Sequence, residues 1–242
     1  MSLGVLYGIG VGPGDPELIS VKGANLISNT KRLFVPIARV KAKSVALDIV
    51  KSYVADDTDV CELVFPMVTD KAELKKRWNE SAIKIARVLK AGEDACFITL
   101  GDPLLYSTYI YLLRALKQIL PTAKIVTIPG ITAFSSVAAL TGFPIGEGKE
   151  AVTIVPTSDD LKAVRDAIKT GGTVVLMKVG KRLQNILEVL NELHVIDDAI
   201  FVANAGMPNQ QIETDLKKLY AEKKEMGYLS TILIKTGRKG KS

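Results

Sequence analysis

The sequence has few of the residues that bind metals or form disulfides. It contains one histidine, His194, and two cysteines, Cys61 and Cys96, which form no Cys-X-X-Cys pair. Two cysteines this far apart are typical of small buried side chains, so we expect both to be buried. His194 follows the helical pattern at residues 181–192 and is expected at a helix end on the surface. The composition therefore predicts no metal bound by protein side chains.

Long hydrophobic runs are also missing. No run approaches the roughly eighteen apolar residues of a membrane span, and the N-terminus leads into a strand without the basic and hydrophobic regions of a signal peptide. We therefore expect no membrane partner and a cytoplasmic location. The 242 residues are 48% hydrophobic, enough for one large domain or two modest ones. The net charge of +6 permits an anionic partner, either nucleic acid, anionic lipid or a polycarboxylate.

The standard nucleotide-binding fingerprints are absent as well. Residues 6–20 read LYGIGVGPGDPELIS, a glycine-rich loop between a strand and a helix. The dinucleotide-binding pattern G-X-G-X-X-G requires a third glycine five residues after the first. That position is Pro13 when the count begins at Gly8 and Asp15 when it begins at Gly10, so neither register fits. Residues 33–37, LFVPI, lack the acidic residue that binds the ribose. No P-loop is present, so the loop argues against an NAD-dependent oxidoreductase and against an NTPase.

The hydrophobic pattern predicts an α/β fold, because short apolar segments alternate with longer amphipathic ones. A helix ends before Leu120-Pro121-Thr122, which predicts domains at 1–121 and 122–242. The connection at 142–150, GFPIGEGKE, is interpreted as a linker or a lid. Strands are expected near 3–10, 31–37, 58–65, 94–100, 124–128, 151–156, 172–179, 198–204 and 229–235. Helices are expected near 16–29, 42–54, 70–91, 103–120, 132–141, 158–169, 181–192 and 215–225.

Three of the predicted strands end in similar junctions. Gly-Asp-Pro follows the strands at 3–10 and 94–100, with Asp15 and Asp102 placed to cap a helix and proline in its first turn. The strand at 124–128 runs through Pro-Gly into a helix that Thr132 is placed to cap. Loops at the carboxyl ends of strands in an open α/β sheet collect on one edge, where ligands bind. These junctions predict one ligand-binding cleft.

The junctions also resemble a known family. The stretches GIGVGPGDPELIS, LGDPLLYS, IPGITAFSSVAALTGFP and VVLMK are similar, in this order, to the signatures of the tetrapyrrole methylases. Members of that family methylate corrinoid and uroporphyrinoid rings with S-adenosylmethionine. The segments PIARVKAKSVALDIV, TDKAELKKRW and TLGDPLLYSTYIYLL resemble the subgroup that methylates carbon 20 of precorrin-2 or cobalt-factor II in cobalamin synthesis. The resemblance covers nearly the whole chain.

The resemblance implies two α/β/α domains with the active site in the trough between them, and a homodimer. The cofactor would be S-adenosylmethionine, released as S-adenosylhomocysteine. The backbone at Leu100–Asp102, together with the helix start at Thr132 and Ala133, would hold the amino-acid and ribose portions of the cofactor. Leu105 and Met177 would face its adenine. Asp102 would both cap its helix and present its charge to the cofactor. By family position the cofactor contacts are Pro13, Leu100, Gly101, Asp102, Leu105, Thr132, Ala133, Met177 and Gly206.

The substrate would be an anionic tetrapyrrole, and its contacts are less marked. Members acting on uroporphyrinogen carry an acidic residue after the second strand, but this chain has a cationic stretch there that includes Arg39 and Lys43. Guanidinium and ammonium groups suit ring carboxylates, so both residues are candidates, and Tyr106 is a third. No residue is marked as a catalytic base, and any cobalt would arrive within the substrate.

Two further alternatives stay open at this point. A related methylase would act on another ring position, as do the uroporphyrinogen-III enzymes at carbons 2 and 7 and the precorrin-4 enzymes at carbon 11. A nucleic-acid-binding module would explain the positive charge and Trp78, which lies among Lys75, Lys76 and Arg77. Acidic residues are interleaved with these cations, so a solvated amphipathic helix is the preferred interpretation and nucleic acid is not expected as a partner.

Overall fold

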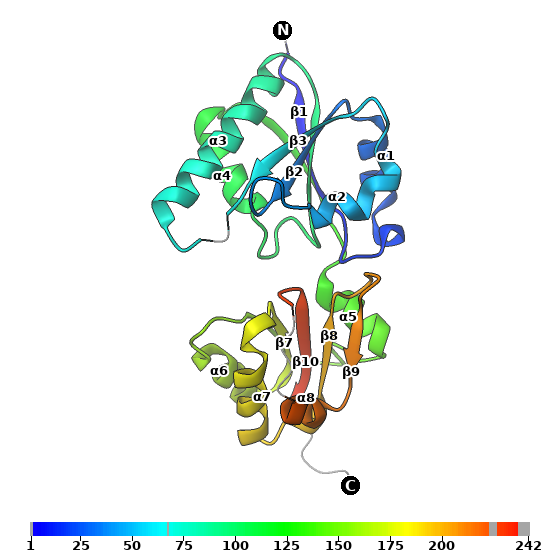
Figure 1. Cartoon of the computed structure of the whole chain (residues 1–242), viewed down its shortest axis with the longest axis vertical. Helices are drawn as coiled ribbons and strands as arrows, with labels where there is room; N and C mark the ends of the chain where they lie inside the picture. Colours follow the sequence, from blue (N-terminus) through cyan, green and yellow to red (C-terminus); the bar gives the residue numbers. More distant parts are fainter. Residues whose placement is uncertain (1, 67, 223–226, 237–242) are drawn as a thin grey trace. The chain divides into compact units, whose positions relative to one another are not determined.

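The chain forms two compact units, each with its own five-stranded sheet (Figure 1). The computed structural model describes residues 2–66, 68–222 and 227–236. The units are Met1–Thr132 and Ala133–Ser242.

The division lies after the boundary expected at residue 121. β5 (Lys124–Ile128) pairs in parallel with β1 (Val5–Gly10) and therefore completes the first sheet. The long helix that ends before Pro121 is thus followed by one more strand of the same unit.

The first sheet is parallel throughout, with strand order β3-β2-β4-β1-β5. Its inner strands are apolar and buried on both faces, as the βαβ connections of a parallel sheet require. Every residue of β4, for example, is buried. The remaining strands are β2 (Arg32–Ile37), β3 (Asp59–Val64) and β4 (Ala95–Thr99).

Helices cover both faces of this sheet. On one face Ile27 and Ile49 pack against Ile9 of β1 and Ile98 of β4. On the other face Ile85 and Leu112 belong to a second core with Leu6 and Phe97. The first layer contains α1 (Val21–Asn29), α2 (Val45–Val50) and the 3-10 turns η1 (Pro16–Leu18) and η2 (Lys51–Tyr53), and the second contains α3 (Lys71–Lys90) and α4 (Tyr109–Ile119).

The second sheet is mixed, with order β6-β7-β10-β8-β9. β6 pairs in parallel with β7, whereas β10 is antiparallel to both β7 and β8, and β8 is antiparallel to β9. β7 and β8 therefore end at the same edge. The strands are β6 (Val152–Pro156), β7 (Gly172–Met177), β8 (Ala199–Ala203), β9 (Gln211–Glu213) and β10 (Ser230–Thr236).

The helices of the second unit are divided unequally between its faces. Alternate residues of β7 separate the two layers, because Val174 and Leu176 belong to one core and Val175 to the other. Among the described helices, α5 (Ala133–Thr141) packs on the face of the smaller core. The larger core contains α6 (Lys162–Thr170), α7 (Leu183–Glu192), α8 (Leu216–Glu222) and the turn η4 (Ile196–Asp198). The turn η3 (Gly180–Arg182) precedes α7.

Several predicted helices begin later than the sequence indicates, and the difference is largest for two of them. The helix expected at 16–29 is a 3-10 turn followed by α1, because the extended residue Ser20 accepts a hydrogen bond from Gly23 N–H and caps a new helix. The helix expected at 103–120 begins at Tyr109. The three-residue strand β9 was not predicted, and the end of the helix expected at 215–225 lies partly outside the described residues.

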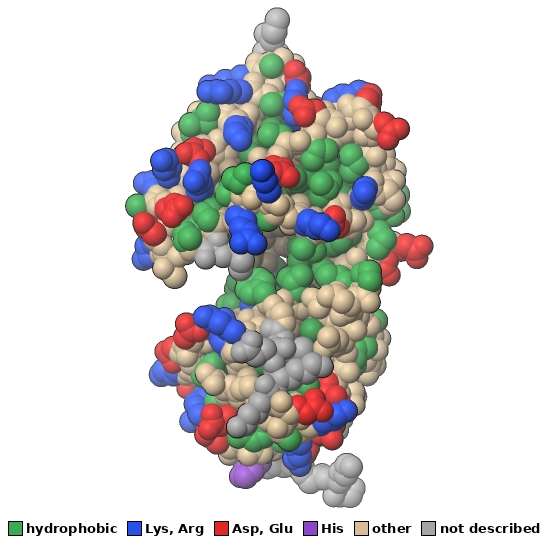
Figure 2. Space-filling model, viewed as in Figure 1, with side chains coloured by type: hydrophobic (Ala, Val, Ile, Leu, Met, Phe, Trp, Pro, Cys, Tyr) green, Lys and Arg blue, Asp and Glu red, His purple; other side chains and the backbone are tan. Residues whose placement is uncertain are grey.

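The aromatic residue of the cationic helix is used within the fold. Trp78 of α3 stacks on Tyr111 of α4, with ring centroids 4.5 Å apart and planes within 8°. Arg77 pairs with Glu80 on the same helix. Cationic and anionic side chains are interspersed over the visible surface of the first unit (Figure 2), as expected for a solvated amphipathic helix. In the described part of the chain, no helix has the length and apolar character needed to cross a membrane.

Candidate functional site

The carboxyl ends of β1 and β4 lie side by side and are joined by their loops. After β1 the chain continues into the layer of α1, and after β4 it continues into the opposite layer with α4. Two neighbouring strands with such connections form a topological switch point, which is the usual ligand position in open α/β sheets. Gly12 and Gly101 form an isolated antiparallel bridge there, in which Gly101 N–H donates to Gly12 O at 2.8 Å. The two loops predicted to face one cleft are therefore directly connected.

Glycine is required where the loops after β1, β4 and β5 meet. A Cβ atom on Gly130 would lie 2.1 Å from the carbonyl oxygen of Gly101 and 2.8 Å from the backbone of Gly10. A Cβ atom on Gly10 would lie 2.5 Å from the same carbonyl oxygen. Only hydrogen fits at these positions, and Gly101 also has a positive φ of 67° that side chains disfavour. Three strand exits thus meet through direct backbone contacts.

Asp102 joins two of these exits. Its Oδ1 accepts a hydrogen bond from Leu104 N–H at 2.8 Å, and its Oδ2 accepts one from Gly130 N–H at 3.1 Å. The prediction that Asp102 caps a helix is wrong, because α4 begins only at Tyr109 and the carboxylate closes a local turn instead. Both carboxylate oxygens fix the backbone of the site.

The loop after β1 is held in place from two sides. Asp15 accepts a hydrogen bond from Glu17 N–H at 2.9 Å and caps η1, as the sequence predicts. The hydroxyl of Tyr53 donates to Pro16 O at 3.1 Å. Pro13, a predicted cofactor contact, is buried between Gly12 and this anchored turn.

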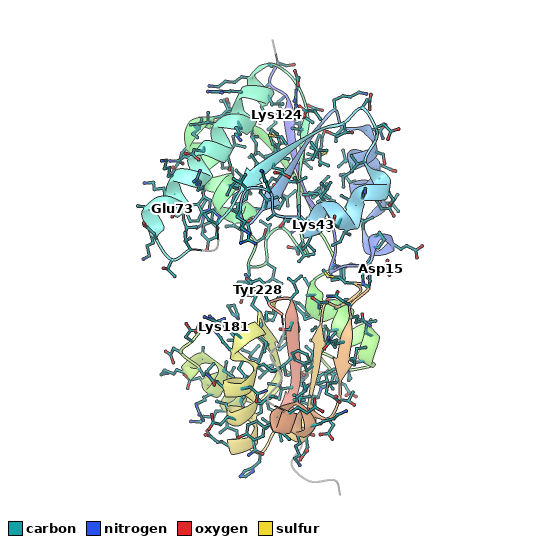
Figure 3. The ribbon with its side chains drawn as sticks, viewed as in Figure 1. Asp15, Lys43, Glu73, Lys124, Lys181 and Tyr228 are labelled. Atoms are coloured by element: carbon teal, nitrogen blue, oxygen red, sulfur yellow. The ribbon has the colours of Figure 1, made fainter. Side chains whose placement is uncertain are left out.

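The predicted substrate residues Arg39 and Lys43 lie in an exposed turn after β2. Ala42 N–H donates to Arg39 O at 2.9 Å, Lys41 has a positive φ of 64°, and Ser44 caps α2. Figure 3 shows Lys43 toward the same end of the first unit as Asp15, with Lys124 at the opposite end. The cationic turn therefore lies at the edge where the glycine loops meet.

In the second unit, the predicted residue Met177 ends β7. Its side chain packs, half-buried, against the core beneath α5. The next residue, Lys178, has a left-handed backbone with φ 61°, and its carbonyl accepts a hydrogen bond from Thr157 Oγ1 at 2.9 Å. Its Nζ lies 5.7 Å from the ring centroid of Tyr228, which is 44% exposed just before β10.

The remaining predicted residues of this unit lie at the start of α5 and after β8. Ala133 is the first residue of α5, and Thr132, directly before it, ends the first unit. Gly206 follows β8 in a tight turn with φ 74°, where its N–H donates to Gln210 Oε1 at 2.7 Å. Because β7 and β8 end at one edge, Met177 and Gly206 lie on the same edge of the second sheet.

The family model for tetrapyrrole (corrin/porphyrin) methylases matches residues 5–220. The chain belongs to this family. The match extends from β1 into α8 and thus includes both units.

Two curated relatives of this methylase cover almost the whole chain. The cobalt-precorrin-2 C(20)-methyltransferase of Salmonella typhimurium is 32% identical over 231 residues, covering 96% of each chain. The probable cobalt-precorrin-2 C(20)-methyltransferase of Methanocaldococcus jannaschii is 34% identical over 236 residues, covering 95% of each.

Solved structures of the family share the fold. A cobalt-precorrin-4 methyltransferase superimposes with a TM-score of 0.74 at 19% identity, covering 96% of this chain and 94% of its own. The uroporphyrin-III C-methyltransferase of Thermus thermophilus, in complex with S-adenosylhomocysteine, gives a TM-score of 0.66 at 18% identity, covering 96% and 92%. The predicted two-part α/β architecture is therefore confirmed for this methylase.

Sequence reasoning missed Lys178 and Tyr228. Sequence analysis predicts only the methionine of VVLMK as a site residue. A lysine directly after a buried strand is nevertheless a visible signal, and it marks Lys178. Tyr228 carries no such signal, because its position beside Lys178 depends on the pairing of β10 with β7.

The connection at 142–150 is tied to β10 at its last residue. Glu150 pairs with Lys235 of β10, and both side chains are mostly buried. Lys235 lies opposite Thr173 near the start of β7, about 13 Å along the strand from Met177. The connection therefore lies toward the opposite edge of the second sheet.

The cysteines and the histidine differ in their surroundings. Cys96 is buried, as expected, and burial raises the pKa of its thiol from 9.0 to about 11. Cys61 is only half-buried on the edge strand β3, contrary to the prediction.

His194 follows α7 with a left-handed backbone at φ 56°, as a helix-ending residue does. Within the described residues no cluster of three His, Cys, Asp or Glu side chains is arranged to hold a metal.

Proposed function

We propose that this chain is an S-adenosylmethionine-dependent methyltransferase that methylates carbon 20 of cobalt-factor II or precorrin-2 in corrin-ring synthesis. The observation that carries the proposal is the meeting of three glycine strand exits around Gly101 in a member of the tetrapyrrole methylase family. Both relatives at more than 30% identity are named for this reaction.

The residues at these exits fit a sulfonium nucleoside. The backbone at Gly101 and Asp102 can approach a ligand closely, because the neighbouring loops carry no side chains between them. Leu105 and Met177 are partly exposed and offer the apolar surface that an adenine ring needs. The cofactor-binding set is proposed as Pro13, Leu100, Gly101, Asp102, Leu105, Thr132, Ala133, Met177 and Gly206.

The cationic residues fit the carboxylates of a tetrapyrrole. Arg39 and Lys43 lie on an exposed turn, so their charges can reach a large polyanion without desolvation in the free protein. In the second unit, Lys178 is a further cation, and its ammonium group lies 5.7 Å from the ring centroid of Tyr228. Tyr106, at 40% exposure, offers an aromatic surface to the conjugated ring.

Bound S-adenosylmethionine supplies an activated methyl group that an electron-rich ring carbon can attack directly. The protein's contribution is therefore mainly orientation. The fixed backbone at Gly101 and Asp102 would hold the methyl donor, and Arg39 and Lys43 would orient the ring through its carboxylates. The rigidity of the glycine junction matters, because a displacement of the order of 1 Å in a near-attack geometry can cost about 100-fold in rate.

Two finer features belong to the same proposal. We propose that the chain acts as a homodimer, as the resemblance to the family implies, and that it works in the cytoplasm. The mixture of charges on the visible surface of the first unit gives no continuous cationic track of the kind nucleic acid requires (Figure 2).

The test is methyl transfer from labelled S-adenosylmethionine, with cobalt-factor II and metal-free precorrin-2 offered in parallel. Carbon NMR locates the label in the product. Label at carbon 20 supports the proposal, and the preferred substrate reveals whether cobalt is already present. Label at another ring carbon, or transfer only to uroporphyrinogen III or precorrin-4, would overturn the choice of position. Absence of cofactor binding by calorimetry would overturn the whole proposal.

A further inference from the structure

The segment between β4 and α4 alternates strictly between buried and exposed side chains. Pro103, Ser107 and Tyr109 are buried, whereas Leu104 and Tyr106 are 59% and 40% exposed. Regular helix begins only at Tyr109. The segment is therefore a loop of turns and bends that presents two large apolar side chains, Leu104 and Tyr106.

The far end of this loop is held by Ser107. Its buried hydroxyl shares a hydrogen bond with Thr99 Oγ1 at 2.9 Å and accepts one from Tyr109 N–H at 3.1 Å. Thr99 is the last residue of β4, and Tyr109 is the first residue of α4. A single hydroxyl therefore ties the loop to both elements that it connects.

The anchor at Tyr109 is itself immobile. Its ring stacks on Phe97 with centroids 5.7 Å apart and fills the space above Gly8, where a Cβ atom would lie 2.1 Å from the tyrosine ring. Its hydroxyl shares a hydrogen bond with Thr127 Oγ1 of β5 at 2.9 Å. Tyr109 thus contacts three neighbouring strands of the sheet.

The two halves of the loop are held by different contacts. The first half is fixed by the Gly12–Gly101 bridge and by the carboxylate of Asp102. The second half contains Tyr106, whose φ of 52° is unfavourable for a residue with a side chain and persists only where the surroundings impose it. The contacts of Ser107 directly follow that strained residue.

We infer that Ser107 is a positioning residue for the substrate half of the loop. It holds Tyr106 toward the flat, conjugated ring of the tetrapyrrole, while the cofactor half from Gly101 to Leu104 is held independently by the Gly12–Gly101 bridge and by Asp102. This inference rests on the proposed function. It predicts that tetrapyrrole affinity and cofactor affinity can be separated by a single hydroxyl that contacts neither ligand.

The test compares wild type with Ser107→Ala and with Thr99→Val, which removes only one of the two hydroxyl partners. Ser81→Ala, which deletes a buried hydroxyl from α3 of the same unit, is the matched control. Ser107→Ala, which removes both hydrogen bonds, should raise the KM for cobalt-factor II by at least about fivefold, with a smaller rise for Thr99→Val, which removes only one. The affinity for S-adenosylhomocysteine, measured by calorimetry, should stay within about twofold of wild type.

A second readout does not depend on turnover. Hydrogen–deuterium exchange of the peptide covering residues 103–109 should become faster in Ser107→Ala and stay unchanged in Ser81→Ala. Cobalt-factor II binding, followed through its absorption spectrum, should weaken in parallel with the rise in KM. An equal loss of S-adenosylhomocysteine affinity, or an unchanged tetrapyrrole affinity, would refute the role of Ser107. Wild-type protein that binds S-adenosylhomocysteine but no tetrapyrrole would instead refute the proposed substrate.

Discussion

The Asp102 carboxylate accepts a hydrogen bond from Gly130 N–H at 3.1 Å, across 28 positions of the sequence. This bond joins the exit of β4 to the exit of β5, the two strands on either side of β1. The same carboxylate closes the turn to Leu104 through its other oxygen. One side chain thereby fixes two backbone segments that the proposed function assigns to the cofactor.

Replacement of Asp102 by alanine should both weaken cofactor binding and destabilise the fold. The change leaves two N–H groups at Leu104 and Gly130 without their acceptors, which costs about 1 to 3 kcal/mol in unfolding free energy. We expect S-adenosylhomocysteine affinity to fall at least about tenfold, since both segments lose their fixed geometry. Calorimetry and urea unfolding measure the two effects. Asp102→Asn, which keeps one carbonyl oxygen, should fall between wild type and alanine, and equal behaviour of the two variants would contradict this account.

Gly130→Ala should damage the glycine junction. The new Cβ would lie 2.1 Å from Gly101 O, so the loops after β4 and β5 must separate, at a cost of about 1 to 3 kcal/mol. We expect cofactor affinity to be lost together with this stability. The control is Gly146→Ala, where the nearest heavy atom to the new Cβ, Val152 Cγ2, lies 3.4 Å away. Thermal unfolding should give the control a stability near that of wild type, and calorimetry should give it a cofactor affinity near that of wild type. A Gly130→Ala variant that binds the cofactor normally would show that the junction tolerates displacement.

The pair between Glu150 and Lys235 should matter for stability but not for the proposed site. Glu150→Ala leaves a mostly buried ammonium group without its partner, which we expect to cost about 2 kcal/mol of unfolding free energy. S-adenosylhomocysteine affinity should be unchanged, because the pair lies toward the opposite edge of the second sheet. The double variant Glu150→Ala with Lys235→Met should regain most of the stability, because no unpaired charge remains. A fall in affinity without a fall in stability would contradict the proposed separation.

Stability should decline at high pH because of Cys96. Burial raises the pKa of its thiol from 9.0 to about 11, so the folded chain keeps a proton that the unfolded chain has already lost. The folded state is therefore fully stabilised below about pH 9 and loses stability up to about pH 11, by roughly 2 to 3 kcal/mol for a shift of this size. Burial also raises the pKa of Tyr109, which acts in the same direction. Urea unfolding between pH 7 and pH 11 should show this decline in wild type and a smaller one in Cys96→Ala; an identical decline would assign the effect to other groups.

Arg39→Ala should weaken tetrapyrrole recognition through charge alone. Its guanidinium lies on an exposed turn, so we expect the KM for the tetrapyrrole to rise about threefold to fivefold, with little change in kcat or in stability. The wild-type KM should also increase with salt more steeply than that of the variant. Lys124→Ala is the matched control, since Lys124 lies at the opposite end of the same unit (Figure 3). Equal effects of the two substitutions would indicate only a dependence on net charge.

Much of the fold and part of the site could be predicted from local patterns. The segment ACFIT of β4 is mainly apolar and buried, and the following Gly-Asp-Pro marks the strand exit, because glycine adopts the positive φ of Gly101 at the least cost. The start of α4 could not be predicted in the same way. Local propensity favours a helix before Tyr109, but the chain forms a loop there with Tyr106 in a strained conformation. The contact of Ser107 with Thr99 and that of Tyr109 with Thr127 outweigh the propensity.

The sequence alone determined the alternation of strands and helices, the glycine junctions and the family. These depend on interactions between residues a few positions apart, such as periodic burial, capping and permitted backbone angles. Only the tertiary structure decided that β1 and β4 are neighbours, that Asp102 reaches Gly130, and that Lys178 lies by Tyr228. Strand order and long-range side-chain contacts follow from how whole layers bury their apolar faces together, and no local pattern encodes that choice.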